Sequence, residues 1–61
     1  MLKLNKIYVI QPLEVEIGNI ILFQDEKIKI LEVTLNKVKF LRCKNNEILE
    51  VPSKALEIAV D

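Results

Sequence analysis

Short runs of aliphatic and β-branched residues alternate with polar breaks along the whole 61-residue chain. The breaks fall six to ten residues apart, at 11–12, 18–19, 24–26, 34–36, 44–46 and 52–53. β-Branched side chains suit the pleated surface of a strand, and breaks at this spacing are typical of an antiparallel meander. We therefore predict an all-β protein, a strongly bent antiparallel meander of five to seven short strands.

The first predicted hairpin turns at Gly18 and Asn19, because both residue types tolerate a positive φ. Residues 13–17 alternate strictly, which predicts that Leu13 and the next two apolar residues face the core while two glutamates face solvent. Residues 20–23 return as a strand that is apolar on both faces.

Two further predicted hairpins share a middle strand, with strands at 27–33, 37–43 and 47–51. Tight turns between them set a register in which Phe40 opposes Ile30 on one side and Val51 on the other. Side chains of a strand alternate between faces, so one face of the sheet becomes the core side. That face holds Ile28, Ile30, Val38 and Phe40.

A second apolar face follows from the same registers and is predicted to be a protein interface. Its members are Leu31, Leu41, Cys43 and Ile48. A chain of this length builds one small core, so a second apolar face needs a cover of its own. Residues 2–10 folded back, a second copy of the chain or a different protein would each provide one.

The ends of the chain complete a single small β-barrel domain over residues 1–61. Residues 2–10 are predicted to form an N-terminal strand that covers the barrel or mediates association, with residues 7–10 buried on both sides. Ser53 follows a proline and is predicted to cap one turn of 3₁₀ helix. Residues 57–60 then resume as the closing strand.

Nine basic and nine acidic side chains cancel, so no overall field draws the protein to phosphate backbones. Four lysines nevertheless share one face of the central hairpin and, with one lysine near the N-terminus, are candidate nucleic-acid contacts. The set is Lys6, Lys27, Lys29, Lys37 and Lys39. Because no aromatic side chain lies near to stack bases, an ordinary solvated face is the favoured interpretation.

The sequence contains no constellation of residues for catalysis and no metal-ligand spacing. It has no histidine. Its single cysteine forms no intrachain disulfide, which favours a reducing cytoplasm or a chain small enough not to need a disulfide. The longest uncharged runs, 7–13 and 17–24, are too short to cross a bilayer. We therefore expect a cytoplasmic protein that is not an enzyme, binds no cofactor or metal and does not enter a membrane.

Residues 15–60 resemble an SH3-like small barrel, the group of SH3, Tudor, KOW and Sm-type domains. The likeness lies in three successive hairpins and in Val51-Pro-Ser-Lys-Ala-Leu56 before a short last strand. The resemblance implies a barrel with a 3₁₀ turn before the closing strand. The chain has no Trp and no row of aromatics, so recognition of proline-rich peptides does not carry over.

Three segments are similar to the carbon storage regulator family of RNA-binding translational repressors: Met1–Lys6, Ile28–Val33 and Lys37–Phe40. That resemblance implies a dimer formed by strand exchange, with Lys6 as an RNA contact. The Gly-Glu and Gly-Asp pairs and the arginine that opens the family's C-terminal helix are missing.

From the second apolar face and the lack of catalytic groupings, we predict a non-enzymatic interaction module, a homo-oligomeric inhibitor, adaptor or ligand-binding protein. A small RNA-binding regulator that uses the lysine-rich hairpin is the alternative.

Overall fold

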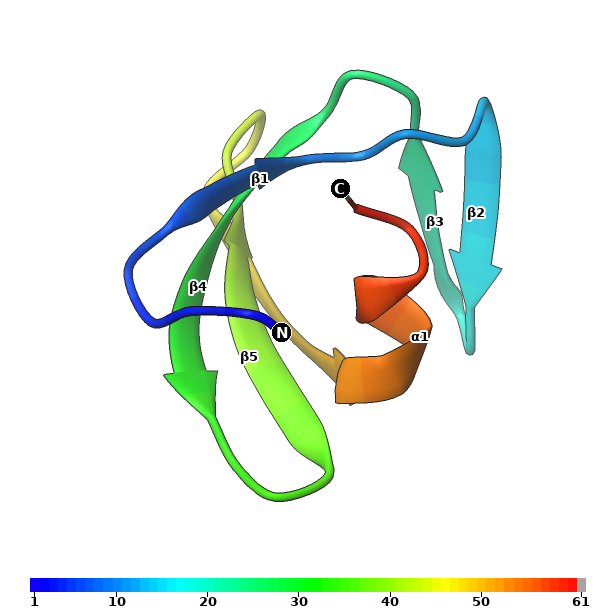
Figure 1. The fold of residues 1–61 in the computed structure, drawn as a ribbon. Coiled ribbons are helices and arrows are strands. Elements are labelled where there is room, and N and C mark those ends of the chain that lie inside the picture. The colour runs from blue at the N-terminus through cyan, green and yellow to red at the C-terminus, as the bar shows by residue number, and fades with distance from the viewer. Residues whose placement is uncertain (61) are drawn as a thin grey trace.

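The computed structural model describes residues 1–60 and shows a mainly β protein with six short antiparallel strands and one short helix (Figure 1). The described strands form a four-stranded sheet in the order β1-β4-β5-β6 and a separate hairpin of β2 and β3, without a closed barrel. The elements are β1 (Ile7–Val9), β2 (Glu14–Ile17), β3 (Ile20–Phe23), β4 (Lys27–Val33), β5 (Lys37–Arg42), β6 (Glu47–Pro52) and α1 (Ser53–Glu57).

A β-bulge divides the pairing of β4 with β5. Ile30 opposes Phe40, as the turn chemistry predicts, but Val33 opposes Val38 and not Lys37. Leu31 is the extra residue that the ladder skips. A bulge increases the local twist of a strand, so it bends β4 where the sheet curves around the core.

The pairing of β5 with β6 differs from the prediction by two residues. Phe40 opposes Leu49, not Val51, because the connecting turn comprises four residues, 43–46, and not two. Asn46 provides the left-handed residue of this turn at a φ of 59°. A shift of two residues leaves the side chains that remain in β5 and β6 on their predicted faces, since the period of a strand is two.

The hairpin of β2 and β3 turns at Gly18, whose φ is 61°, as predicted. Ile17 and Leu22 are buried, and Val15 and Ile20 pack partly buried beside them. Leu13 is 78% exposed and precedes β2, so its predicted inward placement is wrong. Its carbonyl still accepts a hydrogen bond from the Gln24 N–H, at 3.1 Å.

The core lies between the four-stranded sheet, the β2–β3 hairpin and α1. Figure 1 shows α1 in the space between the sheet and the hairpin. It consists of one cluster of buried apolar side chains. These are Leu2, Tyr8, Ile10, Ile17, Leu22, Ile28, Ile30, Val38, Phe40, Val51, Leu56 and Ala59. The predicted core residues of β4 and β5 are confirmed as members.

Both ends of the chain differ from their predictions. Only residues 7–9 of the N-terminal segment form a strand, because Asn5 turns the chain with a φ of 65°. Residues 53–57 form an α-helix and not a 3₁₀ turn, and Ser53 makes no side-chain cap: its N–H donates to the carbonyl of Asn36 at 3.0 Å. The predicted closing strand is reduced to a single bridge between Ile10 and Val60.

Candidate interaction surface

The side of the four-stranded sheet turned away from the core carries a row of four opposed side chains, three of them apolar and one a lysine. Ile7 opposes Lys29, Lys29 opposes Leu41, and Leu41 opposes Ile48. Directly opposite residues of antiparallel strands share a face, so these four side chains lie side by side. We call this side the outer face. It comprises Ile7, Val9, Lys27, Lys29, Leu31, Glu32, Lys37, Lys39, Leu41, Ile48 and Glu50.

The apolar members of the outer face remain open to solvent in the single chain. Ile7 is 53% exposed and Ile48 is 59% exposed, while Leu31 and Leu41 are half-buried. Three of the four predicted interface residues therefore lie together on one face. Cys43 does not: it lies exposed in the turn after β5, because that strand ends one residue earlier than predicted.

The N-terminal segment does not cover the outer face. Leu2 is 5% exposed and packs in the core, on the opposite side of the sheet. β1 joins the edge of β4, which adds Ile7 to the exposed row instead of shielding it. The prediction that residues 7–10 are buried on both sides is accordingly wrong, since only Tyr8 and Ile10 are buried. Residues 2–10 therefore do not cover the outer face, which leaves a second copy of the chain or a different protein as its cover.

The four lysines of the central hairpin lie on one face, as predicted. Lys27 and Lys29 alternate with buried residues of β4, and Lys37 and Lys39 do the same on β5. Lys39 Nζ lies 3.5 Å from a Glu32 carboxylate oxygen in an exposed ion pair. No aromatic side chain lies among these lysines, since Tyr8 and Phe40 face the core and Phe23 belongs to β3.

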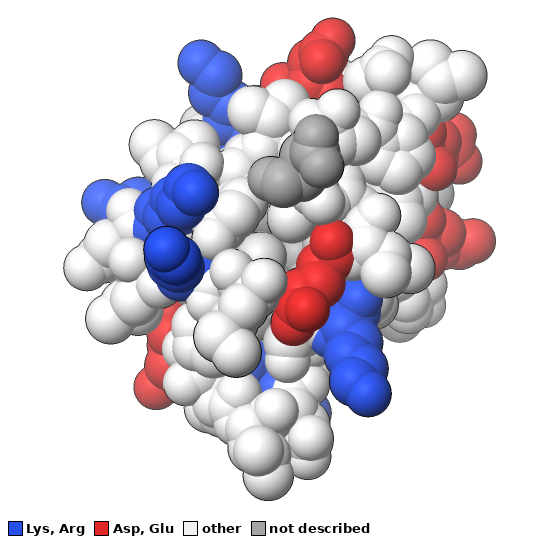
Figure 2. Space-filling view, in the orientation of Figure 1, with Lys and Arg blue, Asp and Glu red and all other residues white. Residues whose placement is uncertain are grey.

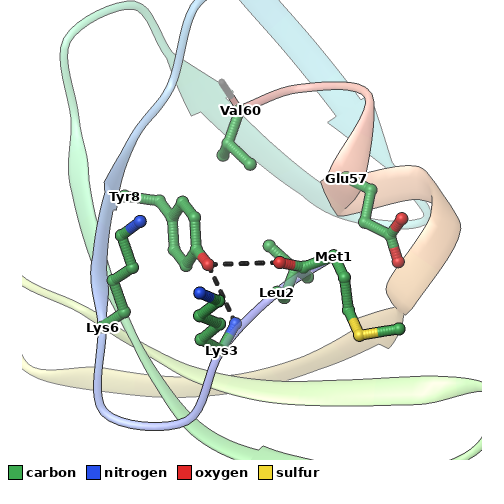
Figure 3. A pocket seen from close by; sticks show the side chains of 7 residues that line it. All are labelled: Met1, Leu2, Lys3, Lys6, Tyr8, Glu57 and Val60. Atoms are coloured by element: carbon green, nitrogen blue, oxygen red, sulfur yellow. Dashed lines mark hydrogen bonds between the residues drawn. The ribbon is translucent and has the colours of Figure 1, made fainter.

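Lys6 is separated from the other four lysines. Its Nζ lies 5.1 Å from the centroid of the Tyr8 ring, and Tyr8 faces the core side of β1. Lys6 lines a small pocket of about 270 Å³, whose lining side chains are drawn in Figure 3. The structure therefore does not place Lys6 with the outer-face lysines, and a single phosphate-binding surface of all five is not formed.

In the pocket of Figure 3, the N-terminal segment is hydrogen-bonded to the side chain of Tyr8. The Tyr8 hydroxyl accepts a hydrogen bond from the Lys3 N–H at 2.8 Å and donates to the Met1 carbonyl at 3.4 Å. The pocket is lined by Met1, Leu2, Lys3, Lys6, Tyr8, Glu57 and Val60. The lining thus includes two lysines and one glutamate, and both hydrogen bonds of the Tyr8 hydroxyl go to the backbone of the N-terminal segment.

A second exposed apolar surface lies on the β2–β3 hairpin. Glu14 opposes Phe23 and Glu16 opposes Ile21, so these four side chains share the side away from the core. Ile21 is 40% exposed and Phe23 is 45% exposed. We call this surface the hairpin face and include Leu13, which precedes it. Lys44 Nζ lies 5.5 Å from the centroid of the Phe23 ring, at the border with the β5–β6 turn.

An ion pair that the sequence analysis did not predict lies where the two sheets meet, between Arg42 of β5 and Glu26, which directly precedes β4. Arg42 Nε and Nη2 donate to the two carboxylate oxygens of Glu26, each at 2.8 Å, and Nη2 also donates to the Ile21 carbonyl at 2.6 Å. The Phe23 N–H donates to Glu26 at 2.8 Å. The two charged side chains are only 11% and 10% exposed.

The hydrogen bonds from Arg42 hold the pKa of the Glu26 carboxyl below its ordinary value, although burial opposes that shift. They likewise raise the pKa of Arg42. Along β5, Arg42 falls on the same face as the core residues Val38 and Phe40, because the three are spaced by two residues. It is also the only arginine among the nine basic residues. An arginine in phase with core positions is the signal that would have predicted this pair.

Neither a metal site nor a membrane-spanning helix is found among residues 1–60. No three acidic or cysteine side chains of these residues gather as ligands, and α1 is far too short to cross a bilayer. Every buried side-chain nitrogen or oxygen that the structure describes has a hydrogen-bond partner. The comparisons with protein families, curated proteins and solved structures found no match for this chain.

Proposed function

We propose that this protein is a non-enzymatic interaction module that binds protein through its outer face, and that a second copy of the chain is its partner. The observation that carries the proposal is the solvent-accessible row of Ile7, Leu41 and Ile48 on the outer face, in which Lys29 stands between Ile7 and Leu41. Contiguous exposed apolar surface rimmed by polar groups marks interaction sites in soluble proteins. The lysines and glutamates of the outer face supply that rim.

The sheet suits this role because its other side is held firmly. Ile28, Ile30 and Phe40, on the core side of the same strands, have no exposed surface. Because the core-side packing already orders the backbone of these strands, the outer face loses little conformational entropy of the backbone on binding. A small inhibitor, an adaptor or a protein that encloses a ligand between copies all fit such a surface.

The same proposal extends to the architecture, for which we infer an SH3-like arrangement. Support comes from the strand order β1-β4-β5-β6, from the hairpin inserted between β1 and β4, and from the bridge of Ile10 to Val60 that follows α1. Arg42 adds a further link between the two sheets. The outer face carries no aromatic row, so the mode of binding proposed here is independent of proline-rich peptides.

The substitution Leu41→Lys tests the proposal. A lysine at the centre of the row loses its hydration when a second copy covers it. Burying its ammonium group without an opposite charge costs about 3 kcal/mol or more of binding free energy. We expect the variant to remain monomeric, by light scattering, at concentrations where the unmodified protein associates. Leu35→Lys is the matched control, since Leu35 is 94% exposed in the β4–β5 turn and outside the outer face.

The far-ultraviolet circular dichroism spectra of both variants must match that of the unmodified protein, so that a change in mass reports association and not unfolding. Association that persists in Leu41→Lys, or that is lost equally in Leu35→Lys, contradicts the proposed surface.

An RNA-binding regulator remains the second candidate, favoured by one observation: four lysines project from the same side of β4 and β5. Glu32 neutralises one of them, and no aromatic side chain lies beside them for base stacking. Phosphate contacts weaken steeply with salt, so gel shifts at about 50 mM salt favour detection. Binding there that is lost on Lys29→Glu would support this candidate, and no shift at all would eliminate it.

A further inference from the structure

The two exposed apolar surfaces of the molecule carry opposite charges. The hairpin face combines Ile21 and Phe23 with Glu14 and Glu16, against one lysine at its border. The outer face combines its apolar row with four lysines and two glutamates, of which Lys39 and Glu32 neutralise each other. In Figure 2 acidic side chains line the side formed by β2, and several of the basic side chains in view lie on the opposite side, with further acidic side chains elsewhere on this face.

We infer that copies of the chain associate head to tail, with the hairpin face of one copy docked on the outer face of the next. This inference rests on the proposed function, because it names the occupant of the outer face and the surface by which that occupant binds. Phe23 and Ile21 cover the row around Leu41, and the glutamates of β2 meet the lysines of β4 at the rim. Apolar centres with complementary charged rims are the usual anatomy of specific interfaces.

The charges decide between this arrangement and a symmetric one. Placing the outer face on its own copy brings Lys27, Lys29 and Lys37 of both copies together, with only Glu50 unpaired to offset them. Placing the hairpin face on its own copy opposes Glu14 and Glu16 to themselves. Like charges facing each other cost binding energy, whereas the mixed contact pairs carboxylates with ammonium groups. The head-to-tail contact is therefore the favoured one.

One molecule has room for both contacts at once. Weak but specific interfaces need about 600 Å² from each partner, roughly a seventh of the 4227 Å² surface of this chain. The two faces belong to separate sheets, so one contact leaves the other face open. A head-to-tail contact closes into a ring or continues as a chain, depending on the rotation between neighbours.

Two single charge reversals, each with a matched control, test the inference by sedimentation. Glu16→Lys alters the hairpin face and Lys29→Glu alters the outer face. Glu57→Lys and Lys54→Glu make the same changes of charge on α1, which belongs to neither face. We expect each face variant to associate at least about tenfold more weakly than the unmodified protein. The α1 variants should associate as the unmodified protein does.

Mixing the two face variants gives the sharpest result. The Lys29→Glu chain keeps an intact hairpin face, and the Glu16→Lys chain keeps an intact outer face. A head-to-tail contact therefore forms between the two variants although neither associates with itself. Recovery of association in an equimolar mixture supports the inference, and no recovery overturns it.

The outcomes also separate this inference from the proposed function. If Glu16→Lys associates normally while Leu41→Lys does not, the outer face is an interface but the hairpin face is not its partner. If Leu41→Lys associates normally as well, the proposed function fails with it. Circular dichroism and thermal melting of each variant confirm that the fold is intact before any mass is interpreted.

Discussion

Replacing Arg42 with methionine should remove much of the stability of this domain. The substitution keeps an aliphatic stem but deletes two hydrogen bonds to Glu26 and one to the Ile21 carbonyl. Both charged side chains are about nine-tenths buried, so the remaining carboxylate keeps only the Phe23 N–H as a partner. Removing one partner of a buried pair costs about 3–5 kcal/mol, and we expect about 3 kcal/mol here because some solvent remains.

That loss is large for so short a chain. At about 0.05–0.15 kcal/mol per residue, its total stability is about 3–9 kcal/mol. A loss of 3 kcal/mol corresponds to a fall in melting temperature of roughly 12–24 °C for a domain of this size. Urea unfolding followed by far-ultraviolet circular dichroism measures the free energy of unfolding directly.

The control is Lys39→Met, which removes the exposed ion pair to Glu32, whose side chains are 43% and 57% exposed. Exposed pairs contribute about 0–1 kcal/mol, so this variant should unfold almost as the unmodified protein does. An Arg42→Met protein no less stable than Lys39→Met would refute the assignment of Arg42 as a link between the sheets.

The same pair sets a pH dependence. Glu26 has a folded pKa below its ordinary value of 4.5, so its contribution to stability is present above that value and is lost as pH falls through the lower, folded pKa. Without Arg42, burial favours the protonated carboxyl instead. The difference in stability between the unmodified protein and Arg42→Met should therefore shrink between about pH 5 and pH 3. An undiminished difference at pH 3 contradicts this account.

Three further substitutions test other parts of the structure. Leu22→Ala, at a side chain with no exposed surface, should cost about 2–5 kcal/mol in urea unfolding, and a cost under about 1 kcal/mol would argue against its place in the core. Gly18→Ala should cost about 1–2 kcal/mol from its φ of 61° alone, since no atom lies within 4 Å of the added methyl group. Cys43→Ser should leave association unchanged by light scattering, because Cys43 lies outside both faces; a weakened association would place it in the interface.

The sequence predicted which side chains face the core more reliably than which residues pair. The β5–β6 register was wrong by two residues, yet Val38 and Phe40 are buried as expected, because a two-residue shift restores the same face. The bulge at Leu31 was not predictable from local chemistry. It arises where the sheet must bend around a core built from distant segments.

The candidate surface was predicted in outline. Leu41 and Ile48 share a face because they oppose each other, and Leu31 joins them because it follows the core-facing Ile30 by one residue. The addition of Ile7, and the burial of Leu2 on the other side, depend on where the N-terminal segment turns, and the left-handed Asn5 sets that turn. The Arg42–Glu26 pair was missed although the β4–β5 register brings the two residues together: Arg42 opposes Ile28, and Glu26 lies two residues before Ile28.

Sedimentation equilibrium of the unmodified protein over a wide concentration range tests the central claim, that the outer face is an association surface. The account predicts a weight-average mass that rises above that of one chain between about 10 μM and about 1 mM, as mass action requires for a small interface. A mass equal to one chain at every concentration would contradict it.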